Sequence, residues 1–251
     1  MIKATHSPKG ASNAAIAATY IDHMGSDLSV VNAARVSFGK KSTWAFECDC
    51  VTDWSCIMAG GCDCGEPQNA RQLSERDTKL IKYLAKHKHM SPFGHAFASF
   101  HVKAPIFVAR QLVKHKFLRW NEISRRYVDE EPEFYVPDQW RGRSADKKQG
   151  SEGTWQPNNQ QLEDAMWQIK DLYDQMIYDG CAPEQARMVL PQSTMTEWYW
   201  SGSLDAFASM CQLRCKPDTQ YESRLVADQI SDMMGELFPV SWEALVEGET
   251  E

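Results

Sequence analysis

The segment Lys114–Tyr127, KHKFLRWNEISRRY, holds the densest set of side chains that could do chemistry. Its cationic or titratable side chains stand beside an amide, a carboxylate and a hydroxyl. They are Lys114, His115, Lys116, Arg119, Arg125 and Arg126, next to Asn121, Glu122 and Ser124. A solvated basic face is the simpler interpretation of a charge run. This run, however, follows an apolar stretch, and its mixture of groups suits an anionic, hydrogen-bonding ligand. The segment therefore predicts a small-anion site.

The elements around this segment are predicted from hydrophobic spacing and turn residues. A helix is expected to start at Pro105 and continue through IFVARQLVKHK, after a half-buried strand at 96–102. Dense polar residues at 117–127 break the helical pattern. Further helices are expected at 76–87, 158–178, 182–190 and 203–213 and from Pro217 on. A strand leading into a short helix or turn is expected at 27–38, and a short strand at 133–137. Residues 140–157 are expected to form a polar loop. This layout indicates one α/β or α+β domain over residues 1–251.

Composition limits the function. The chain has 251 residues, 43% of them hydrophobic, which suits a single core. A net charge of −7 argues against a protein that tracks nucleic-acid backbones. No apolar run is long enough for a signal peptide or a membrane span, so we expect a cytoplasmic protein with no membrane or nucleic-acid partner.

The cysteines and the aromatic run at 198–200 are interpreted as structural rather than functional. Five of the eight cysteines lie between Cys48 and Cys64, inside a polar insertion at about 39–75. Their C-x-C spacing is tighter than zinc sites use, so reduced thiols are favoured, no metal is predicted, and a structural metal stays an alternative. Cys211 and Cys215, and the aromatic run at 198–200, are expected to pack in the core.

Several ordered motifs resemble the flavin-dependent thymidylate synthases. That family carries Arg-His-Arg, seven residues and then Ser. Here Lys114-His115-Lys116 precedes Ser124 by the same interval, with Asn121 and Glu122 in register. Further matches are ARVSF at 34–38, HMSPFGH at 89–95, HVKAPIFVARQ at 101–111, ARMVLP at 186–191 and, less closely, WSGSLDAF at 200–207 and LRCKPDTQYESR at 213–224. The resemblance covers nearly the whole chain outside the insertion.

The resemblance implies a fold and a reaction. The fold would be a central, mostly antiparallel sheet flanked by helices. The reaction would convert dUMP to dTMP, with FAD as cofactor, methylenetetrahydrofolate as carbon donor and NADPH as reductant. Active sites would lie at the subunit interfaces of a homotetramer. The Pro-Cys-His signature of the unrelated classical thymidylate synthases is absent.

The resemblance also implies roles for individual residues. Arg214 would act in catalysis by contacting the uracil ring and favouring its ionised form. The dUMP-binding residues would be Gln111, Lys114, Glu122, Ser124, Arg125, Arg126, Arg187 and Arg214. The FAD-binding residues would be Ser37, His89, Ser91, Lys114, His115, Lys116, Glu122, Ser203, Asp205 and Ser209. Ser124 is expected to form hydrogen bonds rather than act as a nucleophile, because no adjacent base is evident.

The sequence departs from the family pattern mainly on the flavin side. Lysines replace both motif arginines, which keeps the charge but loses the planar fork. Other departures are Arg119 for Ser, Asp205 for Arg, Asp218 for His, and Ser203 and Ser209 for Asn. Two alternatives therefore stay open: transfer of a hydroxymethyl group to a pyrimidine deoxynucleotide, and a non-catalytic nucleotide-binding homologue.

Overall fold

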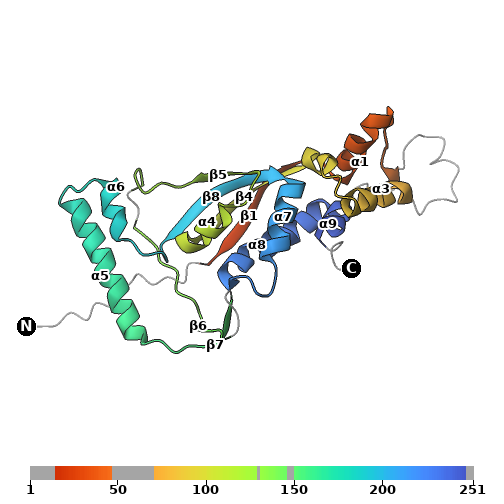
Figure 1. Cartoon of the computed structure of the whole chain (residues 1–251). Coiled ribbons are helices and arrows are strands. Elements are labelled where there is room, and N and C mark those ends of the chain that lie inside the picture. Colours follow the sequence, from red (N-terminus) through yellow and green to blue (C-terminus); the bar gives the residue numbers. More distant parts are fainter. Residues whose placement is uncertain (1–14, 47–70, 129–130, 146–149, 247–251) are drawn as a thin grey trace, which may run out of the picture. The chain divides into compact units, whose positions relative to one another are not determined.

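The computed structural model describes residues 15–46, 71–128, 131–145 and 150–246 (Figure 1). These residues form two compact units, and each unit combines stretches that are far apart in the sequence. Among the described residues, unit 1 draws on 15–22, 98–128, 131–145, 150–202 and 209–233, and unit 2 on 23–46, 71–97, 203–208 and 234–246.

A four-stranded sheet lies at the centre of unit 1. Its order is β1 (Ala17–Met24), β4 (Phe97–Pro105), β8 (Met195–Ser203) and β5 (Leu118–Glu122) (Figure 1). β5 and β8 run antiparallel, and Trp120 lies opposite Trp200. β4 and β8 are also antiparallel, because Ser99 bonds Ser201 at 2.8 Å while Ile106 N–H donates to the carbonyl of Thr194. The predicted mixed α/β class with an antiparallel sheet is confirmed.

Alternation along β4 and β8 builds the core on one face of this sheet. β4 buries Ala98, Phe100, Val102 and Ala104, while the residues between them are only half-buried. β8 likewise buries Trp198 and Trp200, so the core interpretation is confirmed for these two, whereas Tyr199 between them is 51% exposed. Helices α4 (Ile106–Leu112), α7 (Leu204–Arg214) and α8 (Tyr221–Leu237) contribute buried apolar residues; α7 and α8 each continue into unit 2.

The remaining elements of unit 1 are a long helix with a short partner and a hairpin. They are α5 (Asn159–Tyr178), α6 (Pro183–Ala186), the 3-10 turn η3 (Arg187–Val189), β6 (Arg141–Arg143) and β7 (Ser151–Thr154). Asn158 caps α5 by accepting from Gln161 N–H at 3.2 Å. Gly180 follows the helix with φ of +86°, a conformation that favours glycine.

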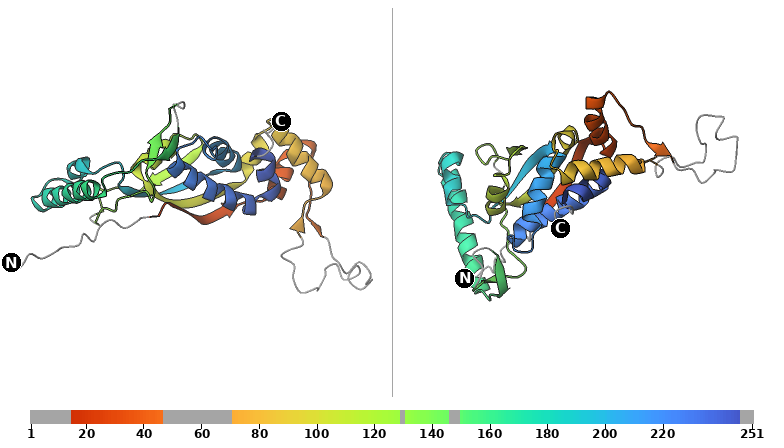
Figure 2. Two further views of the ribbon diagram at one scale, coloured as in Figure 1. Left: turned by 90° about the horizontal axis from the view of Figure 1, so that it is seen from below. Right: turned by 45° about the vertical axis from the view of Figure 1, so that its right-hand side comes forward.

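Unit 2 is mostly helical. It contains α1 (Asp27–Arg35), η1 (Val36–Phe38), β2 (Ala45–Phe46), β3 (Arg71–Gln72), α3 (Glu75–Lys86), η2 (Ser91–His95) and α9 (Pro239–Val246). Helices α3 and α9 lie side by side (Figure 2). The buried carboxylate of Asp27 accepts from Val240 N–H at 3.0 Å and Ser241 N–H at 2.9 Å, which caps the first turn of α9.

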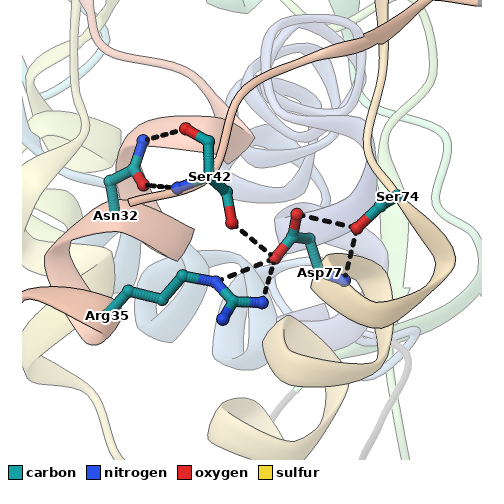
Figure 3. Close-up of polar contacts among 5 residues, drawn as sticks. All are labelled: Asn32, Arg35, Ser42, Ser74 and Asp77. Atoms are coloured by element: carbon teal, nitrogen blue, oxygen red, sulfur yellow. Dashed lines mark hydrogen bonds and ion pairs between the residues drawn. The ribbon is translucent and has the colours of Figure 1, made fainter. Parts of the chain in front are cut away.

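A buried carboxylate joins α1, α3 and the start of the insertion (Figure 3). Asp77 is 3% exposed and accepts from Arg35 Nε at 3.0 Å, Ser42 Oγ at 2.9 Å and Ser74 Oγ at 2.8 Å. Asn32 holds the backbone of Ser42 by donating to its carbonyl and accepting from its N–H. Burial alone would raise the pKa of Asp77, but hydrogen bonds from Ser74, Arg35 and Ser42 together with the Arg35 charge lower it.

Several sequence-based expectations are confirmed and others are wrong. The helices predicted at 76–87, 158–178, 182–190 and 203–213 are present within a few residues, as is the strand that became β4. Residues 27–38 are helical rather than a strand, and residues 133–137 form only one isolated β-bridge. The predicted break at 117–127 contains the strand β5, and the predicted loop at 140–157 contains the β6–β7 hairpin. The last stretch is two helices, and the first starts at Tyr221 rather than Pro217, because a turn at 216–219 intervenes.

Two further expectations concern cysteines and membranes. Cys211 is buried and its thiol contacts the carbonyl of Ala227 at 3.6 Å, which confirms core packing for this residue. The cluster at Cys48–Cys64 lies outside the described residues. Within the described ranges, no helix combines the length and apolarity needed to cross a membrane.

Candidate functional site

Three predicted site residues meet in unit 1 although they come from two distant helices. Gln111 lies in the last turn of α4, His115 follows that helix, and Arg214 ends α7. Arg214 Nε donates to His115 Nε2 at 2.9 Å, and its Nη2 donates to the carbonyl of Gln111 at 3.4 Å. The guanidinium is thus directed at the end of α4, while the carbonyl of Leu213 is satisfied by Thr219 Oγ1 at 3.0 Å.

The imidazole of His115 is kept neutral by its surroundings. Burial and the neighbouring Arg214 charge lower its pKa from 6.5 to about 4. Because Nε2 accepts from Arg214, the ring proton resides on Nδ1, which makes that nitrogen a donor. His115 can therefore donate a hydrogen bond to a ligand at neutral pH without adding charge.

The protonation state of His115 is open to direct measurement. In the ligand-free protein we expect its ring to titrate with a pKa of about 4, and Arg214→Ala should raise that pKa while burial still holds it below 6.5. In the unfolded chain the imidazole has its ordinary pKa of 6.5, so between pH 6.5 and 4 the unfolded state binds the proton more readily than the folded state. The contribution of neutral His115 to the free energy of unfolding is therefore complete above pH 6.5 and is lost as the pH falls toward 4. Histidine ring NMR signals followed against pH make this test, and a midpoint near 6.5 in the unmodified protein would contradict it.

The side-chain amide of Gln111 is held by residues at the start of α8. Its Nε2 donates to Gln220 Oε1, and its Oε1 accepts from Ser223 Oγ at 3.2 Å. An amide nitrogen carries two hydrogens and an amide oxygen has two lone pairs. One donor and one acceptor position of Gln111 consequently stay available to a ligand.

The carboxylate of Glu122, at the end of β5, is held at both oxygens. Thr196 Oγ1 donates to Oε1 at 2.7 Å and Trp120 Nε1 donates to Oε2 at 3.0 Å. Trp120 in turn stacks on buried Trp198, with ring centroids 4.3 Å apart and planes inclined by 17°. Glu122 is therefore oriented by the sheet itself.

The residues after β5 form a turn rich in donors. Ser124 Oγ accepts from Arg126 Nε at 3.2 Å and from Arg126 N–H at 3.4 Å, a hydrogen-bonding rather than a nucleophilic environment. Arg126 also lies over the ring of Tyr127 at 4.8 Å. Arg126 is exposed and Arg125 is half-buried, so the turn offers cations to an incoming anion; Lys114 and Lys116, which precede β5, are also exposed.

Two other predicted residues of unit 1 lie on its helices. Arg187, in η3, is exposed and bonds the carbonyl of Glu184 at 3.3 Å. Ser209, on α7, is also exposed. The hydrogen bonds of Gln111, His115 and Arg214 described above involve neither residue, and the roles predicted for Arg187 and Ser209 stay predictions.

The other predicted flavin residues belong to unit 2. Ser37 in η1, His89 after α3 and Ser91 in η2 are exposed, whereas Ser203 at the end of β8 is buried. Asp205 follows in the first turn of α7, and its Oδ1 is buried with no hydrogen-bond partner among the described residues. The predicted site residues are thus divided between the two units.

Sequence reasoning missed the residues that orient Gln111 and Glu122. Gln220 and Ser223 lie inside 213–224, a stretch whose similarity to the family indicated only a later helix. Trp120 lies in the predicted break at 117–127, and Thr196 lies on a strand that the sequence did not predict. The aromatic run at 198–200, of residue types enriched in strands, is the signal that could have located the strand containing Thr196.

Comparison with known proteins gives a consistent result. Residues 19–240 match the family model described as thymidylate synthase complementing protein. The flavin-dependent thymidylate synthase of Thermus thermophilus is 35% identical over 229 residues, covering 90% of this chain and 74% of the relative. That of Thermosipho africanus is 32% identical over 231 residues, covering 90% and 89%.

Solved structures with a similar fold include a UMP/dUMP methylase from Streptomyces cacaoi. Its complex with 5-Br dUMP has a TM-score of 0.72 at 29% sequence identity, covering 95% of this chain and 96% of the other. Its complex with 5-Br UMP has a TM-score of 0.74, covering 96% and 97%.

Proposed function

The chain belongs to the flavin-dependent thymidylate synthase family and is an enzyme that methylates dUMP to dTMP with a flavin, and from this premise we propose that the flavin is FAD, the carbon donor methylenetetrahydrofolate and the reductant NADPH. The relatives' names and the nucleotide analogues in the similar structures support the substrate class. The residue roles below are part of the same proposal.

The contact of Arg214 with both His115 and Gln111 carries this proposal. It brings a guanidinium, a neutral ring donor and the backbone carbonyl of Gln111 together in a half-buried place. A pyrimidine becomes nucleophilic as negative charge builds on its carbonyl oxygen, and a preorganised guanidinium stabilises that charge. Lys114 and Lys116 add positive charge nearby in sequence, which suits an anionic reduced cofactor.

Residues of each unit, taken separately, carry groups that suit a flavin: Asp205 belongs to unit 2, and His115, Lys114 and Lys116 belong to unit 1. The buried acceptor Asp205 Oδ1 lacks a donor among the described residues, and FAD offers hydroxyl and imide donors. His115 offers a neutral donor, and Lys114 and Lys116 are exposed and can approach a phosphate or the ring. Bound flavin would supply the hydride that completes the methyl group; the chain's own residues bind, orient and polarise the nucleotide.

Arg187 is proposed to hold the nucleotide phosphate. Arg187→Ala should weaken dUMP binding by about 2 kcal/mol, roughly thirtyfold, because a charge-assisted hydrogen bond is lost. FAD binding should change far less. Arg76→Ala, which removes an exposed arginine of α3, serves as the control and should leave both affinities unchanged. Calorimetric titration with dUMP and with FAD makes the comparison, and equal weakening of both ligands by Arg187→Ala would count against the phosphate role.

A spectroscopic experiment tests the proposed reaction. Protein loaded with FAD should lose its flavin absorbance when NADPH is added without oxygen. The absorbance should return only when dUMP and methylenetetrahydrofolate are both supplied. No flavin uptake even in the presence of dUMP would overturn the proposal. Return of the absorbance with UMP would indicate that this chain accepts the ribose 2′-hydroxyl, as a UMP/dUMP methylase such as the Streptomyces cacaoi protein must.

The assembly and location proposed for this chain follow from its family. We expect a homotetramer with active sites at subunit interfaces. Such an arrangement would allow the site residues of unit 2 to serve a site in another copy. Light scattering of the purified protein measures the assembly directly. A cytoplasmic location stays a prediction.

A further inference from the structure

A line of hydrogen bonds leads from a partly buried ion pair to Gln111. Glu222, 5% exposed at its side chain, pairs with Arg141 Nη2 at 2.6 Å through Oε1. Its Oε2 accepts from Gln220 Nε2 at 3.2 Å. Gln220 Oε1 then accepts from Gln111 Nε2, and Gln111 Oε1 accepts from Ser223 Oγ. All of these residues belong to unit 1.

The charge of Glu222 sets the direction of every bond in this line. A carboxylate paired with arginine only accepts, so Gln220 must turn its NH₂ group toward Glu222. The carbonyl of Gln220 must then face Gln111, which in turn must present its own NH₂ group. An isolated amide can rotate by half a turn at little cost, but Gln111 cannot do so without losing the partly buried hydrogen bond to Gln220.

The free positions of Gln111 therefore have a defined order, with the donor on the Gln220 side and the acceptor on the Ser223 side. At carbon 4 uracil offers an acceptor, O4, whether or not its N3 is ionised, whereas cytosine offers a donor, the N4 amino group. An amide of defined orientation matches one of these edges and opposes the other. Arg214, the proposed pyrimidine-contacting residue, donates to the backbone carbonyl of Gln111, so Gln111 lies next to the residue that would contact the pyrimidine.

We propose that the Arg141–Glu222 pair and Gln220 orient the Gln111 amide so that it accepts uracil and rejects cytosine. Gln220 and Glu222 are then positioning residues, and Gln111 determines the specificity. This inference rests on the proposed function, since it takes dUMP as the substrate. A site built to hydrogen-bond one edge discriminates strongly, because the wrong base leaves buried polar groups unpaired.

Glu222→Gln provides the sharpest test. The new amide would direct its oxygen at Arg141 and its NH₂ group at Gln220. Gln220 would then rotate, followed by Gln111, and the donor and acceptor of Gln111 would exchange places. The ratio of the dCMP to the dUMP dissociation constant should fall by at least about tenfold relative to the unmodified protein.

Two companion variants keep the test decisive. Gln220→Met removes the amide that connects Glu222 to Gln111 and leaves Gln111 free to rotate. The ratio of the dCMP to the dUMP dissociation constant should therefore fall toward one without dCMP becoming the preferred ligand. Asp77→Asn makes the same acid-to-amide change in a second buried, arginine-paired carboxylate, in unit 2, and should leave the ratio unchanged.

The measurement is calorimetric titration of each FAD-loaded variant with dUMP and with dCMP. If Glu222→Gln does not fold, the Gln220→Met result decides. The orientation proposal would be overturned if a folded variant of the two still binds dUMP and keeps the dCMP to dUMP dissociation-constant ratio of the unmodified protein. Failure of the unmodified protein to bind either nucleotide would instead contradict the proposed function.

Discussion

Arg214→Ala is expected to reduce dTMP formation by roughly 10²–10³-fold in kcat while the protein still folds and its flavin is still reduced by NADPH. Arg214 is half-buried and points at the end of α4, where it meets His115 and Gln111. A guanidinium held there stabilises charge on the pyrimidine more in the transition state than in the ground state, so its loss lowers turnover. Arg214→Lys keeps the charge without the fork and should remain badly impaired.

Single-turnover oxidation of reduced flavin by dUMP and methylenetetrahydrofolate, with the product measured in parallel, gives this rate. A helix-capping role for Arg214 predicts instead a stability loss of about 1 kcal/mol or less and nearly normal turnover. Capping of its own helix α7 is disfavoured because Thr219, not Arg214, satisfies the carbonyl of Leu213, whereas Arg214 donates to the carbonyl of Gln111 in the last turn of α4. Near-normal product formation by Arg214→Ala would refute the catalytic role.

Asp77→Ala is expected to cost about 3–5 kcal/mol in the free energy of unfolding. Asp77 is buried with Arg35, whose side chain is only 14% exposed, so removing the carboxylate leaves a largely buried guanidinium without its partner. The hydroxyls of Ser42 and Ser74 lose their acceptor at the same time (Figure 3). Since η1 follows Arg35 directly, FAD affinity should fall with stability if Ser37 contacts the flavin.

Urea unfolding followed by circular dichroism measures this cost. Glu75→Ala is a suitable control, because it breaks the exposed pair of Glu75 with Lys79 on the same helix and should cost no more than about 0.5 kcal/mol. Since hydrogen bonds lower the pKa of Asp77, its contribution should be complete near neutral pH and disappear as acid protonates the carboxylate. Equal destabilisation by the Asp77 and Glu75 variants would contradict the structural role.

Local patterns predicted the elements that bury one regular face. The helix α3 has apolar residues at helical spacing and is capped by Ser74, which accepts from Asp77 N–H at 3.2 Å. Proline before α4 and glycine after α5 mark helix ends in the same local way. Such elements are recognisable because their signals lie within a few residues.

The missed strands depend on partners far along the chain. β5 reads as a polar break because Arg119, Asn121 and Glu122 are exposed, and it is a strand only because β8 pairs with it. The β6–β7 hairpin is short and almost entirely polar, so no hydrophobic period reveals it.

The candidate site shows the same division. Family motifs indicated Arg214, His115 and Gln111 separately, but no spacing rule predicts that a residue of α7 bonds one that follows α4. The same holds for the line from Glu222 to Gln111, which depends on how the start of α8 packs. Residue identity was therefore predictable through resemblance, whereas the mutual orientation of the side chains required the fold.

Mass spectrometry of the nucleotide product tests the central claim most directly. Purified protein is incubated with FAD, NADPH, methylenetetrahydrofolate and dUMP, and the nucleotides are then separated and their masses are measured. The account predicts dTMP, formed only when all four are present and sharply reduced in Arg214→Ala. Unchanged dUMP from flavin-loaded protein, or a hydroxymethylated nucleotide as the sole product, would contradict it.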